Sequence, residues 1–173
     1  MNKNKVFITN DKGTLEEYES IIQKTSRAIT EAFTNDRAYT GPVPFDLKRL
    51  VDVPMLPEKG IGFDGALEQT KKLVLPNFVR TSSTDYMAHL HSATLLETIA
   101  AELIISTFNQ SMDSWDQSPV ATEIEVQVVK QLCKLYGYDS NSDGVFTSGG
   151  SQSNTTGIFL ARDWFCNKKL NYD

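Results

Sequence analysis

Residues 144–157 limit the possible folds most, because a short apolar segment runs into a glycine pair and then into a hydroxyl-rich helix start. The apolar run 145–148 predicts a β-strand, and a helix is expected over residues 151–165. Glycine lets the backbone turn sharply and approach a ligand closely. The first amides of a helix lack partners within the helix, so the turn predicts a binding site for an anion such as phosphate.

Other glycine-rich motifs offer alternative interpretations of this turn. A P-loop needs a lysine after its second glycine, and this turn has none. The dinucleotide fingerprint needs a glycine spacing that Gly149, Gly150 and Gly157 do not have. The G-x-S-x-G elbow of α/β hydrolases is missed by one residue, and it would make Ser151 a nucleophile. A capped turn that binds nothing stays open as well.

Composition and charge narrow the class of protein. The chain has 173 residues, of which 40% are apolar and 23% charged, so it fits one domain or part of one. Its formal net charge is -5, and no basic run is longer than Lys168-Lys169, so a nucleic-acid partner is not expected. The two cysteines, Cys133 and Cys166, follow no metal-ligand spacing and are expected to be free thiols. We therefore expect no metal site.

The chain also lacks the apolar runs of an export signal or a membrane span. Only three apolar residues follow the lysines of the first ten residues, and Glu102 interrupts the run 100–105. With the free thiols, this predicts a cytoplasmic protein without a membrane partner.

Hydrophobic periodicity predicts a mainly helical chain. Helices are expected over residues 14–35, 45–51, 66–75, 92–109 and 119–136. Thr14 with Glu17, and Thr122 with Glu125, have the spacing of capping boxes, and Gly137 fits the end of the last helix. Apolar side chains of the helix over 92–109 are expected to be buried, whereas the first helix is expected to pack on another chain or domain.

The predicted strand has no partner strand elsewhere in the sequence. A strand followed by a helix belongs to a mostly parallel sheet, and a lone strand cannot satisfy its backbone hydrogen bonds. We therefore expect a helical segment over residues 1–117 and the start of a larger α/β domain over residues 118–173, with the rest of that domain beyond Asp173.

Several ordered stretches together resemble the N-terminal part of the group II pyridoxal-phosphate-dependent amino acid decarboxylases, in particular the L-2,4-diaminobutyrate decarboxylase branch. The stretches are YMAHLH (86–91), NQSMDSWDQSP (109–119), TEIE (122–125) and GVFTSGGSQSN (144–154). The resemblance implies the fold-type I architecture of pyridoxal-phosphate transferases and a carbon–carbon lyase of amino acid metabolism. It also implies a homodimer in which the N-terminal helices wrap over the partner subunit.

The same resemblance assigns roles to individual residues. Gly149, Gly150, Ser151 and Gln152 would hold the phosphate of pyridoxal 5'-phosphate. His91 and Asp113 would lie on the substrate side of the cofactor, with Asp113 reaching the neighbouring subunit's site and selecting a cationic side chain. From the residues alone, a packed or solvent-facing His91 and a solvent-exposed Asp113 stay open.

The resemblance implies that the catalytic residues are missing from this chain. The family's Schiff-base lysine and the carboxylate that pairs with the ring nitrogen have no matching position here, so the chain alone is expected to be inactive. Two other functions stay open: a hydrolase with Ser151 as nucleophile, and a non-catalytic helical dimerisation module. A zinc site at His89 and His91 is disfavoured, because the chain has no other histidine.

Overall fold

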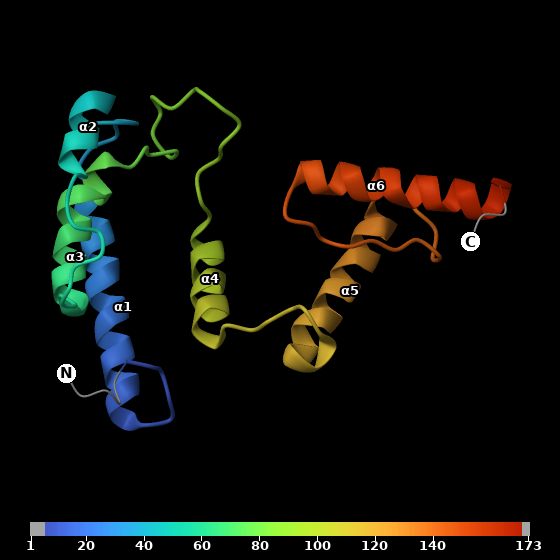
Figure 1. Ribbon diagram of the computed structural model, residues 1–173, viewed down its shortest axis with the longest axis horizontal. Helices are drawn as coiled ribbons and strands as arrows, with labels where there is room; N and C mark the ends of the chain where they lie inside the picture. The colour runs from blue at the N-terminus through green and yellow to red at the C-terminus, as the bar shows by residue number, and fades with distance from the viewer. Residues whose placement is uncertain (1–5, 171–173) are drawn as a thin grey trace. The chain divides into compact units, whose positions relative to one another are not determined.

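The computed structural model describes residues 6–170 (Figure 1). The chain divides between Thr107 and Phe108 into two compact units, and each unit is described by itself. Residues 1–5, part of the segment over which no export signal is predicted, lie outside the described residues. The predicted division between residues 117 and 118 refers to the domains of the complete family fold and stays a prediction.

The described residues form helices without any strand. The helices before the division, and the one that crosses it, are α1 (Lys12–Ala32), α2 (Pro44–Leu50), α3 (Gly62–Leu73), the 3-10 turn η2 (Leu75–Asn77) and α4 (Leu96–Phe108). Those of the second unit are the 3-10 turn η3 (Trp115–Gln117), α5 (Pro119–Leu135), α6 (Gly150–Phe165) and the π-helical turn η4 (Cys166–Leu170). The predicted number and order of the long helices are confirmed, and their ends differ by a few residues.

Helix α1 begins two residues before the predicted start because Asp11, and not Thr14, caps it. The Asp11 carboxylate accepts the amide hydrogens of Gly13 at 3.0 Å and Thr14 at 3.3 Å. The Thr14 hydroxyl donates to the Asp11 carbonyl oxygen at 2.8 Å. Asp11 thus satisfies two of the amides that the first turn leaves without partners, so the predicted capping box at Thr14 is wrong.

The carboxyl end of α1 is held by Arg80. Its guanidinium donates to the carbonyl oxygen of Asn35 at 2.6 Å and to that of Ala32, and it lies 5.3 Å from the ring centroid of Phe33. The last carbonyl groups of a helix have no partners within the helix. The arginine supplies partners at this end, and α1 finishes at Ala32 instead of residue 35.

Replacing Arg80 should destabilise the first unit. We expect Arg80→Ala to lower the free energy of unfolding by about 2 to 3 kcal/mol, since two charge-assisted hydrogen bonds and a cation–π contact are lost. Urea unfolding measures this. Arg49→Ala is the matched control, because the Arg49 guanidinium stacks on the Phe45 ring at 4.3 Å and itself forms no hydrogen bond among residues 6–170. Equal losses in both variants would contradict the capping role.

Helices α1 and α3 lie side by side and are joined by ion pairs (Figure 1). Lys24 donates to Asp64 at 2.7 Å, and Lys71 lies 3.6 Å from Glu31. The hydrogen bond to Asp64 raises the pKa of the Lys24 amine. The hydrogen bond from Arg27 lowers the pKa of the Glu31 carboxyl. These pairs are exposed, so they orient the two helices more than they stabilise them.

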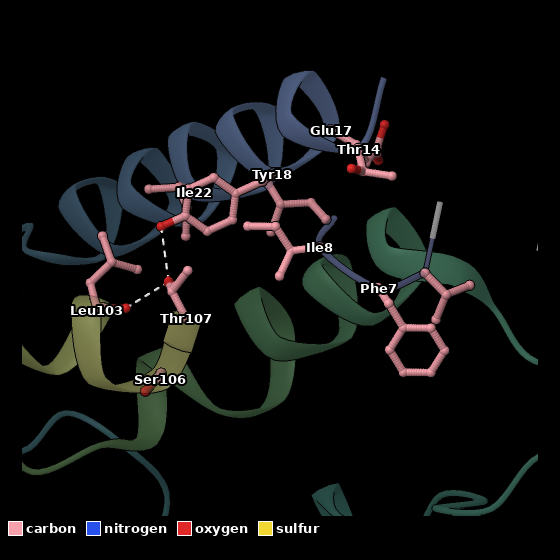
Figure 2. A pocket seen from close by; sticks show the side chains of 11 residues that line it. Phe7, Ile8, Thr14, Glu17, Tyr18, Ile22, Leu103, Ser106 and Thr107 are labelled. Carbon is pink, nitrogen blue, oxygen red and sulfur yellow. Dashed lines mark hydrogen bonds between the residues drawn. The ribbon is translucent and has the colours of Figure 1, made fainter. Parts of the chain in front are cut away.

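A cavity of about 350 Å³ lies between α1, α4 and the segment before α1 (Figure 2). The Tyr18 hydroxyl and the Thr107 hydroxyl meet at 3.1 Å across it, and Thr107 also donates to the Leu103 carbonyl oxygen at 2.7 Å. Most of its other walls are apolar, including Phe7 and Ile22. None of the predicted site residues lines this cavity.

Helix α4 differs from its prediction in start and in burial. It begins at Leu96 instead of residue 92, and Leu96 is 80% and Ile104 62% exposed. The predicted burial of this helix is therefore wrong for the chain as described. Its sequence, LETIAAELIISTF, carries apolar side chains on every face, and one neighbouring helix cannot cover all of them.

Helix α5 begins at Pro119, as predicted, but without the predicted capping box. The Thr122 hydroxyl donates to the Ser118 carbonyl oxygen at 2.9 Å, and Ser118 is the residue that precedes the helix. Gly137 has a φ of +80°, which glycine adopts without strain, and the helix ends just before it. The predicted C-terminal stop is thus confirmed.

The predicted strand over residues 145–148 is wrong, since this segment pairs with no strand among residues 6–170. Two backbone amides of this segment donate to side-chain oxygens instead. The Phe146 amide donates to the Glu125 carboxylate at 3.2 Å, and the Ser148 amide donates to the Gln152 side-chain oxygen at 3.0 Å. A strand needs a second strand to complete its ladder, and the described residues supply none.

Candidate functional site

The candidate site is the turn between residues 144–148 and the start of α6. Helix α6 begins at Gly150, one residue before the predicted start. Gly149 precedes the helix with φ 162° and ψ 173°, an extended conformation open to any residue. The glycine pair therefore matters through the space it leaves rather than through its backbone angles.

Open backbone donors face this space. The first amide of the helix with an acceptor is that of Ser153, which donates to the Gly149 carbonyl oxygen at 3.0 Å. Within residues 6–170, the amides of Gly150, Ser151 and Gln152 donate to no acceptor. A Cβ atom added at Gly149 or Gly150 would meet nothing within 4 Å. Three free amides at the positive end of a helix of 16 residues suit an anion the size of phosphate.

Side chains on both sides of the glycine pair hold the turn in shape. The Gln152 side-chain oxygen accepts from the Ser148 amide at 3.0 Å and from the Ser148 hydroxyl at 2.5 Å. The hydroxyls of Thr147 and Ser153 meet at 2.6 Å. Because its oxygen is engaged, the Gln152 side chain has only its NH₂ group left for other partners, and that group can only donate.

Ser151 does not have the setting of a hydrolase nucleophile. It is the second residue of α6, and the described non-glycine residues with positive φ are His89 and Asn109. A nucleophile elbow places its serine on a strained turn between strand and helix, and here Ser151 has joined the helix. Its hydroxyl forms no hydrogen bond among residues 6–170 and is free to donate to an anion.

The other predicted site residues are held by their own loops. The His91 ring meets the Tyr86 ring edge-on, with 6.4 Å between centroids. His91 belongs to the first unit, and Asp113 and the turn to the second. The Ser111 hydroxyl donates to one Asp113 carboxylate oxygen at 2.8 Å. The structure thus brings Gly149, Gly150, Ser151 and Gln152 together in one turn.

Two glutamates at the start of α5 have roles that the sequence interpretation missed. Glu125 accepts the Phe146 amide hydrogen, and Glu123 accepts from the Trp115 indole nitrogen at 3.1 Å. Glu125 was predicted to serve the helix start, as part of a capping box with Thr122. The spacing in the sequence could have indicated that Glu125 faces the rest of the chain, because Glu125 stands four residues before the buried Val129 and lies on the same face of the helix.

Two classes of binding feature have no candidate in the described part of the chain. No three histidine, cysteine, aspartate or glutamate side chains within residues 6–170 stand close enough together to hold a metal ion. No helix there is both long and apolar enough to cross a bilayer.

Comparisons with known proteins give one consistent result. A family model described as the pyridoxal-dependent decarboxylase conserved domain matches residues 44–171. The chain is 38% identical to an L-2,4-diaminobutyrate decarboxylase of Acinetobacter baumannii over 92% of its length and 31% of that relative. It is 36% identical to an L-2,4-diaminobutyrate decarboxylase of Rhizobium meliloti over 82% of its length and 29% of that relative. The chain thus spans roughly a third of the length of these curated relatives.

A solved structure agrees with the sequence comparisons. It is the glutamate decarboxylase domain of a diaminobutyrate-pyruvate transaminase and L-2,4-diaminobutyrate decarboxylase from Vibrio parahaemolyticus, with a TM-score of 0.91 and 37% identity over 97% of this chain and 37% of that one. The expected fold-type I architecture is confirmed by this neighbour, and the hydrolase alternative loses its support. The chain belongs to the pyridoxal-dependent decarboxylase family, whose enzymes depend on pyridoxal phosphate.

Proposed function

We propose that this chain is the N-terminal part of a pyridoxal-phosphate-dependent L-amino acid decarboxylase, a carbon–carbon lyase of amino acid metabolism that acts on L-2,4-diaminobutyrate. The observation that carries the proposal is the start of α6, where the glycine pair Gly149-Gly150 leaves open space and three amides of the first turn have no partner, in a chain of this family. Relatives named for this substrate, at 36% and 38% identity, support the choice of amino acid.

The turn would bind the phosphate of the cofactor. The amides of Gly150, Ser151 and Gln152 would donate to phosphate oxygens, and the Ser151 hydroxyl would add a fourth donor. Gly149 leaves the space through which the phosphate reaches these amides. When bound, the cofactor supplies an electron sink for the loss of the substrate carboxylate. The protein contributes the position of the cofactor and a network of donors that is already formed.

His91 and Asp113 would contact the substrate. The Ser111 hydroxyl engages one carboxylate oxygen of Asp113 and leaves the other free for a partner. A carboxylate is the natural partner of the side-chain ammonium group of a diamino acid. The His91 ring rests edge-on against Tyr86, which fixes one side of the imidazole and leaves both nitrogens available for hydrogen bonds.

We also propose that the complete protein is a cytoplasmic homodimer and that its subunit contains sequence outside this chain. Among the described apolar side chains Ala28 and Val129 are buried, whereas Leu96, Ile104 and Phe108 are at least 60% exposed. Apolar surfaces this extensive are normally covered by other protein. The lysine that binds the cofactor and the acid that pairs with its ring nitrogen would lie in sequence that this chain does not contain.

Carbon dioxide release by the purified full-length protein tests the proposal. With pyridoxal phosphate added, we expect kcat/KM for L-2,4-diaminobutyrate to exceed that for L-glutamate and L-tyrosine by at least about 100-fold, which corresponds to about 2.7 kcal/mol of transition-state discrimination. A higher kcat/KM for glutamate or tyrosine would overturn the assignment of L-2,4-diaminobutyrate as substrate. Absence of decarboxylation with all three, in a protein loaded with cofactor, would overturn the reaction.

A further inference from the structure

Residues 144–148, which lead into the turn proposed to bind phosphate, contact α5 at two points. Gly144 lies so close to Val129 that a Cβ atom at Gly144 would stand 3.3 Å from the Val129 Cγ1 atom. Two residues later, the Phe146 amide donates to the Glu125 carboxylate at 3.2 Å. Val129 is buried and Glu125 is half-buried, and their separation of four residues places them on one face of the helix. The segment therefore lies along that face of α5.

Side-chain oxygens accept hydrogen bonds from two backbone amides of this segment. The Phe146 amide donates to Glu125, and the Ser148 amide donates to Gln152. Glu125 thus ties the segment to α5, while Gln152 ties it to α6. Together with the bond between the Thr147 and Ser153 hydroxyls, these two bonds hold the turn against α5 and α6.

We infer that Glu125 is a positioning residue for the cofactor phosphate, an inference that rests on the proposed function. Its carboxylate fixes Phe146, and through residues 147–149 it fixes the place where the chain turns in front of the open amides of Gly150 and Ser151. Within residues 6–170 Glu125 forms no ion pair, so the amide is its partner. A turn held in advance binds its ligand at a smaller cost in ordering.

Three variants of the full-length protein separate this role from a general effect on α5. Glu125→Ala removes the acceptor, and Glu125→Gln keeps an oxygen that can accept the same hydrogen bond. Glu123→Ala is the matched control, because Glu123 stands on the same turn of the helix and holds Trp115 instead. Hydrogen exchange at the Phe146 amide and the dissociation constants of pyridoxal phosphate and of inorganic phosphate are measured for each.

In Glu125→Ala we expect exchange at Phe146 to accelerate at least tenfold and both dissociation constants to rise on the order of fivefold, the effect of one lost hydrogen bond. Glu125→Gln and Glu123→Ala should stay within about twofold of the parent for all three measurements. Far-ultraviolet circular dichroism of the parent and variants should agree, which separates loss of the bond from loss of the helix.

Two results would overturn the positioning role: parental affinity in Glu125→Ala, or equal weakening in Glu125→Ala and Glu123→Ala. Failure of Glu125→Gln to restore affinity would also overturn it, since the retained oxygen would then have no effect. A different result marks failure of the proposed function. If the parent protein binds neither pyridoxal phosphate nor inorganic phosphate, the turn is not a phosphate site, whatever the exchange at Phe146 reports about the Glu125 bond.

Discussion

A Gly149→Asp variant should be more stable than the parent protein and should lose its affinity for pyridoxal phosphate. Gly149 occupies the residue before α6, where aspartate caps a helix by accepting from the amides of the second and third helical residues. Those residues are Ser151 and Gln152, whose amides are open. The new carboxylate would occupy the place of the phosphate. The backbone at Gly149 is extended and the space beyond it is empty, so the side chain fits.

The changes in stability and in cofactor affinity differ in size and are measured separately. We expect the free energy of unfolding without cofactor to rise by about 0.5 to 1 kcal/mol, from the cap and the helix dipole. Affinity for pyridoxal phosphate should fall on the order of 100-fold, since a carboxylate takes the donors and repels the dianion. Urea unfolding and a cofactor titration followed by absorbance measure the two changes.

Gly157→Ala is the matched control for this variant. Gly157 lies inside α6, where alanine stabilises a helix by about 1 kcal/mol, and a Cβ there meets nothing within 4 Å. It should therefore raise stability and leave cofactor affinity unchanged. If Gly149→Asp kept the parental affinity, the amides of Ser151 and Gln152 would not bind the phosphate.

The second large effect is expected at Asp113, in substrate selectivity. In the full-length enzyme, Asp113→Asn should lower kcat/KM for L-2,4-diaminobutyrate by about 10- to 100-fold, because a charge-assisted contact with the side-chain ammonium becomes a neutral one. Use of L-2-aminobutyrate, which lacks that ammonium group, should change by less than about threefold.

Asp116 provides a control with the same local geometry. The Ser114 hydroxyl donates to its carboxylate at 2.7 Å, as the Ser111 hydroxyl does to Asp113 at 2.8 Å, so Asp116→Asn disturbs the loop in the same way. It should leave the ratio of the two kcat/KM values unchanged. An equal loss for both substrates in Asp113→Asn would assign Asp113 to loop structure rather than to substrate selection.

Local sequence signals predicted the helices well and the caps poorly. Periodicity located the five long helices and Gly137 ended α5, because the spacing of apolar residues and the freedom of glycine are local properties. The capping boxes at Thr14 and Thr122 had the correct spacing, but Asp11 caps α1, and the Thr122 hydroxyl donates to the Ser118 carbonyl oxygen instead of accepting an amide. Adjacent polar residues compete for the same few amides, and the outcome depends on geometry that spacing does not contain.

The sequence by itself determined the family and the helical order, and it predicted the turn that we propose binds phosphate, since glycines, hydroxyls and a helix start within a few residues permit few chemistries. Only the tertiary structure decided how the turn is held. In place of the predicted strand, the Phe146 amide donates to Glu125, which is 21 positions away in the sequence, and the Ser148 amide donates to Gln152, which is 4 positions away. A contact between α5 and a segment so far along the chain follows from packing against Val129, which no local pattern encodes.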